Sequence, residues 1–509
     1  MKRGNVKAIA LVAMCFALFM ANLDDTVVNV ALPKIQMSLD SGVSGLQWVV
    51  NAYTLTAASL LLPSGTLGDI YGRKRVLLVG LVIFTISSVI CGFTPNLEIL
   101  IAGRVLQGVG AAALIPSTLA IVTDTFPAPQ EQTKAIGIWA AVSGIAFIAG
   151  PVLGGLLVDT LGWQSVFFLN IPMGAIAFAL TVRVVKESKG LHTQRLDVPG
   201  MLLSIVILAC LAYAFTDGNT GGAGSLLILA GISFCSFLWV ESRTAYPMLP
   251  LPLFENPTFA IVNVVSVLLL FTLVGLLFMF SLFLQQVQGY SAAAAGLRFL
   301  PLNGAFALAL LYSGWLAARL GWRTAITVGL VVAGIATLSF LQISPDTEYR
   351  AIVSNLVISG FGAGLALAPL TAAAMSTVIS SQVGIASAIL STSNRLGGVL
   401  GVALQGTIFS QQLTSELGRL LTSWGLPANL QEQIIANALH GGNKIPANLP
   451  PSISPQALQQ ATNEAFVSGM HAVVLVGAIA LLAGAVLVLI FVAPNFNQST
   501  QKSPLLVKR

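Results

Sequence analysis

Long apolar stretches, separated by short polar connections, fill most of the 509-residue chain. A helix needs about 20 consecutive apolar residues to cross a bilayer. The pattern is typical of an all-α integral membrane protein. It predicts about fourteen membrane-spanning helices, at residues 8–31, 46–67, 76–94, 98–122, 134–158, 165–185, 198–216, 222–241, 258–286, 293–317, 324–343, 351–376, 383–411 and 465–492.

Composition and charge support a membrane location. Hydrophobic residues make up 56% of the chain and charged residues 8%, and such an apolar surplus must face lipid. Most of the 24 Lys and Arg residues fall in loops on the N-terminal side of the predicted bundle. The opposite side holds only Lys34, Arg350, Arg419 and Lys444. Because cytoplasmic loops carry the excess of basic residues, we expect a multi-pass protein of the bacterial inner (plasma) membrane, with both termini in the cytoplasm. The net charge of +6 then requires no nucleic-acid partner.

An internal repeat predicts two related halves. The pattern Gly65, Leu67, Gly72 and Lys74 after the second span recurs as Gly314, Leu316, Gly321 and Arg323 after the tenth. Such repeats are common in membrane transporters. We predict two pseudo-symmetric six-helix halves, at residues 1–190 and 251–509, with a two-helix insert at 191–250 between them. The second half includes a surface loop with some helix at about 412–464, on the outer face.

The chain lacks the marks of an enzyme. It contains no phosphate-binding loop of the type G-x-x-x-x-G-K-[ST]. The four cysteines fall in apolar stretches, and the three histidines are scattered without metal-ligand spacing. We therefore expect no metal site and no cofactor other than a proton as the coupling ion.

Asp24 and Asp25 lie inside the first predicted span, and Arg104 lies inside the fourth. Charged groups in a bilayer cost at least a few kcal/mol and usually serve a function. Removal from water raises the pKa of a carboxyl group, and a nearby guanidinium lowers it, so a balanced pair can exchange a proton. Asp24, Asp25 and Arg104 are the candidates for proton coupling. The alternatives are acids that reach the outer surface or cap a helix break, and a purely structural ion pair between the first and fourth spans.

Residues 65–75, GTLGDIYGRKR, predict a tight turn between the second and third spans. Gly65, Asp69, Gly72, Arg73 and Lys74 are expected to form a gating loop at the cytoplasmic face. There Asp69 can pair with Arg73 and meet the N-terminal end of another helix, for which the thirteenth span is a candidate. The alternative is a cationic loop that only sets topology.

The fifth span contains a proline among small residues, at Gly150, Pro151, Gly154 and Gly155. This arrangement permits close packing and a pliable kink. Further polar and aromatic side chains are candidates for lining a substrate cavity, although an interface belt or ordinary packing explains the aromatic ones equally well. The cavity candidates are Asn29, Trp48, Tyr53, Gln107, Trp139, Phe147 and Arg395.

Four motifs in order resemble the major facilitator superfamily, and in particular its fourteen-helix drug–proton antiporter branch of multidrug efflux transporters. Residues 23–33, LDDTVVNVALP, resemble the branch's first-span signature, and residues 65–75 resemble the superfamily's loop motif. Residues 104–110 resemble the fourth-span motif linked to proton transfer, and residues 150–155 the fifth-span motif of antiporters. The resemblance implies a major facilitator fold and favours Asp24 over Asp25 as the proton site.

The sequence departs from the family pattern in three places. Gln164 and Ser165 follow Trp163 where the branch usually has Arg-Trp, before Asn170 resumes the pattern. Ala318 stands where Asp69 would repeat, and the second half has no evident buried acid. Because of Ala318, a latch in the second half must differ from that in the first. The missing buried acid weakens the case for a second proton site or a divalent-cation substrate.

We therefore expect a proton-coupled antiporter that exports small amphipathic or cationic drugs and toxic compounds from the cytoplasm or inner leaflet by alternating access. Small amphipathic molecules and membrane lipid are its expected partners, and a periplasmic adaptor is left open. Two alternatives remain: an exporter of one specific metabolite or antibiotic, and a lipid-handling or sensory membrane protein of the same fold.

Overall fold

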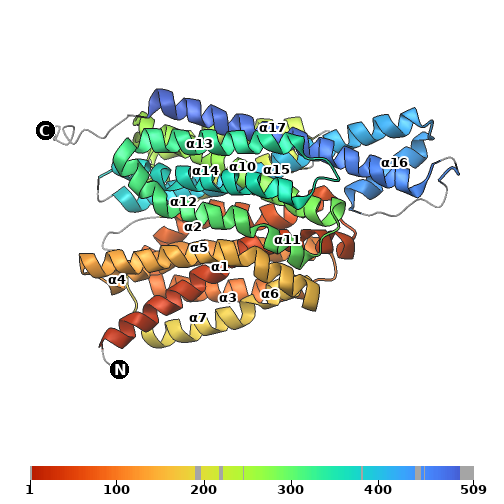
Figure 1. The fold of residues 1–509 in the computed structure, drawn as a ribbon. Coiled ribbons are helices and arrows are strands. Elements are labelled where there is room, and N and C mark those ends of the chain that lie inside the picture. Colours follow the sequence, from red (N-terminus) through yellow and green to blue (C-terminus); the bar gives the residue numbers. More distant parts are fainter. Residues whose placement is uncertain are drawn as a thin grey trace.

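The computed structural model of the protein is a bundle of long helices (Figure 1). It describes residues 3–189, 196–216, 222–244, 246–379, 382–441, 449–451 and 453–492. No strand occurs among these residues, so the predicted all-α fold is confirmed for this part of the chain.

Helices α1 to α7 form one group, which we call the first half. They are α1 (Arg3–Leu39), α2 (Val43–Tyr71), α3 (Arg73–Gly92), α4 (Leu97–Thr125), α5 (Pro129–Leu161), α6 (Ser165–Phe168) and α7 (Asn170–Val184). Within this group α1 packs against α5 and α7, while α4 packs against α2 and α3.

Helices α10 to α17 form the second half. They are α10 (Pro257–Leu282), α11 (Ala292–Arg298), α12 (Leu300–Leu320), α13 (Trp322–Ser339), α14 (Tyr349–Ser376), α15 (Val383–Ser423), α16 (Ala428–Leu439) and α17 (Pro455–Phe491). Short 3₁₀ helices lie at η2 (Leu251–Glu255) and η4 (Phe340–Gln342), and a short π-helix lies at η3 (Phe283–Val287). Here α10 packs against α15 and α17, while α14 packs against α12 and α13. The packing scheme of the first half is thus repeated.

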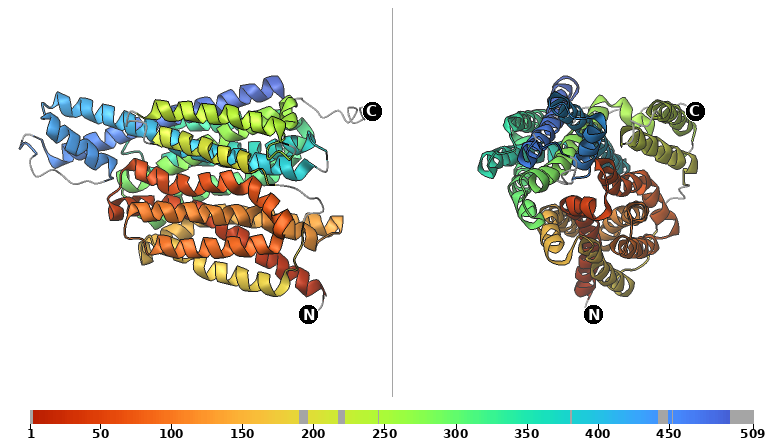
Figure 2. Two further views of the ribbon diagram at one scale, coloured as in Figure 1. Left: turned by 180° about the vertical axis from the view of Figure 1, so that it is seen from behind. Right: turned by 90° about the vertical axis from the view of Figure 1, so that its right-hand side faces the viewer.

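Two more helices, α8 (Val198–Thr216) and α9 (Ala223–Arg243), lie at the side of both halves, as the end-on view in Figure 2 shows. They pack against each other, and α8 also contacts α2 and α15. The rings of Trp48 on α2 and Tyr213 on α8 lie 5.8 Å apart. Helices α8 and α9 therefore cover the place where the two halves meet along α2 and α15.

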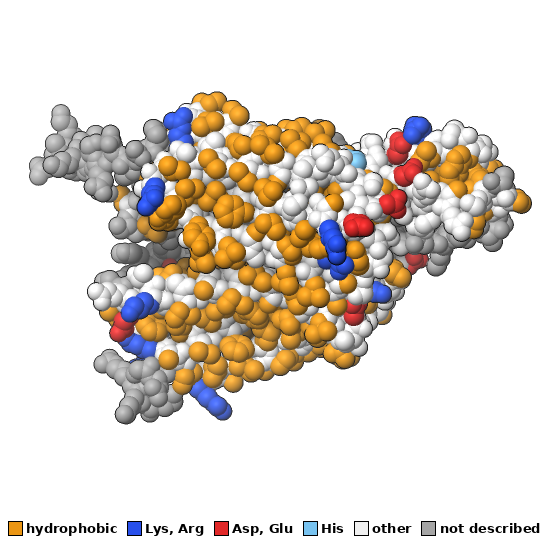
Figure 3. All heavy atoms as spheres, in the orientation of Figure 1, with side chains coloured by type: hydrophobic (Ala, Val, Ile, Leu, Met, Phe, Trp, Pro, Cys, Tyr) orange, Lys and Arg blue, Asp and Glu red, His pale blue; other side chains and the backbone are white. Residues whose placement is uncertain are grey.

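Twelve helices in the described part of the chain are long and apolar enough to cross a membrane. Hydrophobic side chains cover the middle of the face in Figure 3, and most of its charged side chains lie toward the two ends. The protein is therefore a multi-pass membrane protein. Helices α2 and α15, predicted as spans at 46–67 and 383–411, are not among the twelve. Buried polar residues such as Gln47 and Asn51 on α2 and Gln405 on α15 lower the hydropathy of both helices.

The segment predicted as a surface loop at 412–464 contains more helix than expected. Helix α15 is 41 residues long and continues to Ser423, α16 follows, and α17 already begins at Pro455. Leu417, Leu421, Leu430 and Ile434 are buried among these helices. These helices are amphipathic and pack on one another. Their polar residues explain why the composition of this segment resembles that of a loop. Residues 442–448 and 452 lie outside the described residues.

Candidate functional site

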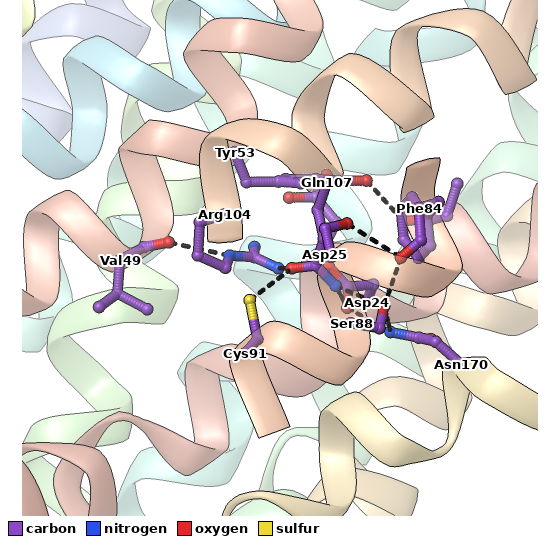
Figure 4. Close-up of polar contacts among 12 residues, drawn as sticks. Asp24, Asp25, Val49, Tyr53, Phe84, Ser88, Cys91, Arg104, Gln107 and Asn170 are labelled. Atoms are coloured by element: carbon purple, nitrogen blue, oxygen red, sulfur yellow. Dashed lines mark hydrogen bonds and ion pairs between the residues drawn. The ribbon is translucent and has the colours of Figure 1, made fainter. Parts of the chain in front are cut away.

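Asp24 is completely buried inside the first half, on α1 (Figure 4). Its Oδ2 atom accepts a hydrogen bond from Nη1 of Arg104 on α4, at 2.5 Å. Its Oδ1 atom accepts from the side-chain amides of Asn170 on α7, at 2.7 Å, and Gln107 on α4, at 3.3 Å. Both carboxylate oxygens therefore have donors, as a buried charge requires. The predicted partnership of Asp24 and Arg104 is present.

Arg104 is also enclosed, with 1% of its side chain exposed. Its Nε atom donates to the carbonyl of Val49 at 3.1 Å, and Nη1 donates to Oε1 of Gln107 at 2.9 Å. The guanidinium carbon lies 4.3 Å from the centre of the Tyr53 ring, a distance at which a cation is attracted to an aromatic face. Arg104 thus ties α4 to both α1 and α2.

Two members of this network were not assigned a role from the sequence. The Ser88 hydroxyl on α3 accepts from Gln107 at 2.7 Å and from Asn170 at 3.3 Å, and it donates to the Phe84 carbonyl. Asn170 follows a break between α6 and α7. Serine and asparagine are common in apolar helices, so a single sequence does not indicate which of them have a function. An acid or an arginine in such a helix is rare and is therefore noticed.

Asp25 lies next to Asp24 but faces another partner. Its Oδ2 atom is 3.7 Å from Nη1 of Arg395 on α15, and 24% of its side chain is exposed. This ion pair joins the first half to the second, whereas the Asp24 network lies entirely within the first half. The sequence grouped Asp25 with Arg104. The structure pairs it instead with Arg395, because successive residues on a helix point about 100° apart.

A cavity of about 780 Å³ opens between the halves at the end of the bundle that carries Asp69 and Arg73, which we call the cavity end. This volume is in the range of small-molecule sites. The first half contributes Leu61, Ile115, Thr123 and Trp139, the second half contributes Gly384, Ser387 and Ser391, and the segments flanking α8 and α9 contribute Asp197 and Tyr246. All three parts of the chain therefore form its wall.

The predicted cavity residues fall in several places. Trp139 lines this cavity. Tyr53 and Gln107 do not, because both are buried at the Asp24–Arg104 pair, and Trp48 packs against Tyr213. Phe147 is 43% exposed on α5, and its carbonyl accepts from Asn303 on α12. Asn29 and Arg395 are half-buried where the halves meet. Aromatic and amide side chains thus serve mainly in packing and hydrogen bonding here.

At the opposite end, which we call the closed end, the halves are in contact. The Ser281 hydroxyl donates to the Asn29 carbonyl at 2.6 Å, and Gln285 donates to the Val30 carbonyl at 3.0 Å. Gln47 donates to the carbonyls of Val402 and Ala403, both at 2.7 Å. These side-chain bonds cross from one half to the other and close the passage on this side.

The fifth-span motif contributes to the same closure. Gly150 and Gly154 pack against Thr26 and Val27 of α1, and a Cβ atom on Gly155 would meet the backbone of Ala292 and Ala293 in α11. Further along α5, the Asp159 carboxylate accepts from the backbone amides of the same two alanines, at 3.2 and 2.8 Å. A Cβ atom on Gly296 of α11 would in turn meet the Pro151 carbonyl of α5. The motif therefore permits close contact between α5 and α11.

The loop motif forms ion pairs within the first half. Arg73 contacts Asp69 at 2.9 Å and Asp124 on α4 at 2.6 Å. The amide of Lys74 donates to Glu187 at 3.0 Å, and its Nζ atom donates to the Val182 carbonyl. Gly65, Asp69 and Arg73 line the cavity, and so does the start of α15 on the other side. Among the described residues, Asp69 makes no ion pair or side-chain hydrogen bond with the thirteenth predicted span, and its partner is Arg73.

Gly72 joins α2 to α3 with a φ of +114°, a conformation that favours glycine. A Cβ atom there would also meet the carboxylate of Glu187. We expect Gly72→Ala to lower the unfolding free energy by about 1–3 kcal/mol. Gly65→Ala is the control, since nothing lies within 4 Å of a Cβ at that position. Thermal unfolding in detergent, followed by size-exclusion chromatography, would measure both. An equal effect of the two changes would contradict the prediction.

The buried ion pair and the cavity between two similar halves are features typical of a membrane transporter. The family model described as Major Facilitator Superfamily matches residues 14–402. The chain belongs to the Major Facilitator Superfamily.

Several similar proteins are resistance proteins by name. The multidrug resistance protein Stp of Mycobacterium tuberculosis (strain CDC 1551 / Oshkosh) is 35% identical, over 94% of this chain and 92% of that protein. The methylenomycin A resistance protein of Streptomyces coelicolor is 35% identical, over 80% and 86% of the two chains. The tetracenomycin C resistance and export protein of Streptomyces glaucescens is 30% identical, over 94% and 90%.

Solved structures share the fold. A bacterial homologue of the human lysosomal transporter Spinster superposes with a TM-score of 0.67 at 18% identity, covering 97% of this chain and 99% of that one. The human organic anion transporter MFSD10 gives a TM-score of 0.58 at 15% identity, covering 95% and 99%. At these identities the likeness concerns the fold alone.

Proposed function

We propose that the protein is a proton-coupled antiporter that exports small amphipathic or cationic drugs and toxic compounds. The substrate would enter from the cytoplasm or the inner leaflet, and inward proton flow would drive it out by alternating access. The names of the similar proteins, among them a multidrug resistance protein and an antibiotic resistance and export protein, support the substrate class.

One observation carries the coupling proposal: the fully buried Asp24–Arg104 ion pair. Leaving one partner of such a pair buried and uncompensated costs about 3–5 kcal/mol, so protonation of Asp24 would favour a different packing of α1, α4 and α7. These helices belong to one half, and their rearrangement would alter how that half sits against the other. A proton at Asp24 would in this way favour one orientation of the cavity over the other.

We also propose that the chain belongs to the fourteen-helix branch, with α2 and α15 as the additional spans. Helix α2 has 29 residues, enough to cross a bilayer. Both helices lie inside the bundle, where α2 packs against α4 and α15 packs against α10 and α17. Helices α8 and α9 would then be the insert between two six-helix halves. With both termini cytoplasmic, the cavity end would face the cytoplasm.

Transport in proteoliposomes tests the proposed function. With the chain reconstituted and a pH gradient imposed, we expect uphill movement of an amphipathic dye, because proton flow supplies the free energy. A protonophore should reduce this movement to the level of protein-free liposomes, while an imposed electrical potential without a pH gradient serves as the control. Dye movement that ignores both the pH gradient and the protonophore would sink the coupling proposal.

A narrower function is a second candidate. Two of the similar proteins are named for resistance to a single antibiotic, which favours an exporter of one antibiotic or metabolite. A competition panel separates the two candidates. Inhibition of dye transport by many unrelated amphipathic compounds supports broad export, and inhibition by one chemical series supports the narrow function.

A further inference from the structure

Two buried carboxyl groups meet at α8 and α9, outside the Asp24 network. Asp197 directly precedes α8 and is 8% exposed, and Glu241 lies in the last turn of α9 and is 3% exposed. Asp197 also lines the cavity between the halves. We call these two residues the carboxyl pair. The proposed antiport makes no use of them.

The backbone holds one oxygen of each carboxyl group. Oδ1 of Asp197 accepts from the Gly200 amide at 2.9 Å and so caps the first turn of α8. Oε2 of Glu241 accepts from the Leu249 amide at 3.0 Å, in the segment that leads from α9 to η2. The Leu249 side chain packs against the hydrophobic core of the second half. Glu241 therefore anchors this segment to the end of α9.

The other two oxygens point toward the same place and lack a donor. Oδ2 of Asp197 and Oε1 of Glu241 are both buried without a hydrogen-bond partner among the described residues. They lie 2.5 and 2.8 Å from the position that a Cβ atom on Gly200 would take, and the two side chains are close enough to share a hydrogen bond. Buried polar atoms are almost always paired. A single donor between the two oxygens would satisfy both.

The neighbouring charged groups do not neutralise the carboxyl pair. Among the residues that the structure describes, neither carboxyl group takes part in an ion pair. Arg243 lies over the Trp239 ring, and Asp69 and Arg73, which line the same cavity, pair with each other. The other titratable side chain on this wall of the cavity is Tyr246. Two carboxylates in contact repel each other and are not both ionised when buried.

We propose that Asp197 and Glu241 share one proton, and that this second protonation site holds the adjacent wall of the cavity in place. The shared proton makes the hydrogen bond between Oδ2 and Oε1. Its loss leaves two negative charges in contact, so the carboxyl groups separate and Glu241 releases the Leu249 amide. The proton leaves through the cavity, which Asp197 lines.

The wall that depends on the carboxyl pair is the segment 246–250. Four of its five residues line the cavity, and the fifth is Leu249, which Glu241 binds. An alkaline solution in the cavity should therefore loosen this segment, and an acidic one should fix it. The site lies away from α1 and α4, so it does not depend on the proposed antiport.

Infrared difference spectroscopy on the full chain in lipid nanodiscs tests the shared proton. Raising the pH should remove a C=O band of a protonated carboxyl group. That band should be missing in both Glu241→Gln and Asp197→Asn, because either amide removes the shared proton. Glu255→Gln is the matched control, since Glu255 is exposed in η2 and its replacement should leave the band in place. A spectrum in which neither variant of the carboxyl pair changes a protonated-carboxyl band would overturn the proposal.

Spin-label mobility tests whether the carboxyl pair holds the cavity wall. The label is placed on Tyr246→Cys, or on Ser387→Cys of α15 as the control position in the same cavity, with the exposed Cys235 replaced by Ser. We expect mobility at 246 to rise several-fold with increasing pH and mobility at 387 to stay constant.

Glu241→Gln separates a proton from a cation as the link between the two groups. Its side-chain amide can donate to Asp197 but cannot titrate, so the label at 246 should stay immobile at every pH. If a cation held two ionised carboxylates together, Glu241→Gln would instead weaken the link and free the label. That result, or a label at 246 that ignores pH in the parent, would overturn the proposed role of the carboxyl pair.

Discussion

Asp24→Asn is expected to abolish pH-driven transport of an uncharged dye, whereas Asp25→Asn retains it. Asp24 lies in a closed network of the first half, with Arg104 at 2.5 Å, and a neutral amide there removes the group that takes up the proton. Asp25 lies outside this network and faces Arg395 on α15, where the two halves meet. An uncharged dye is used so that neither substitution changes a direct charge–charge contact with the substrate. Uphill flux under a pH gradient in proteoliposomes is the measurement.

A folding control is needed, because Asp24→Asn leaves Arg104 buried without its counter-charge. Such a loss costs about 3–5 kcal/mol and can destabilise the protein. The double variant Asp24→Asn with Arg104→Gln removes both charges, so no uncompensated charge remains. We expect this variant to be as stable as the intact chain by thermal unfolding and still uncoupled. Recovery of pH-driven flux in the double variant would show that the pair is purely structural.

The sequence predicts most of the helices because a membrane span is a long, uninterrupted apolar segment, which is easily recognised in a sequence. The span predicted at 98–122 corresponds to α4, and its start is fixed by Asn96, whose side chain accepts from the Ile99 amide at 3.0 Å. The predicted repeat also has a structural counterpart, because Gly72 and Gly321 join consecutive helices with φ values of +114° and +80°. Glycine at such a turn is visible in the sequence.

The site could be predicted only where charge makes a residue conspicuous. Asp24 and Arg104 stand out in apolar spans, and the structure brings them together. Ser88 and Asn170 complete the network. Serine and asparagine occur throughout the chain, so the sequence does not single out these two. The partner of Asp25 could not be inferred either, because Arg395 is 370 residues away and the pairing depends on how α1 and α15 meet. Long-range contacts between halves leave no periodic signal in one sequence.

The second large effect is expected at the contact between α5 and α11. Gly155 lies so close to Ala292 and Ala293 that an added Cβ would meet their backbone. Backbone atoms cannot move aside as a flexible side chain can, so Gly155→Val should separate α5 from α11. The closed end then opens, and the protein should shift away from the cavity-open state. We expect transport to fall at least about tenfold, since each 1.4 kcal/mol of shift changes the ratio of states tenfold.

Cysteine accessibility reports this shift directly. Ser387 lines the cavity, so Ser387→Cys should react with a membrane-impermeant maleimide in the cavity-open state, in a background where the exposed Cys235 is replaced by Ser. Adding Gly155→Val should slow the reaction. Gly144→Val is the matched control on the same helix, because nothing lies within 4 Å of a Cβ there. If both glycine variants label at the rate of the parent, contact between α5 and α11 does not hold the closed end shut. Slower labelling in the Gly155 variant alone assigns the fifth-span motif to the closure of one face of the transporter, because of the two glycines only Gly155 packs against the backbone of α11.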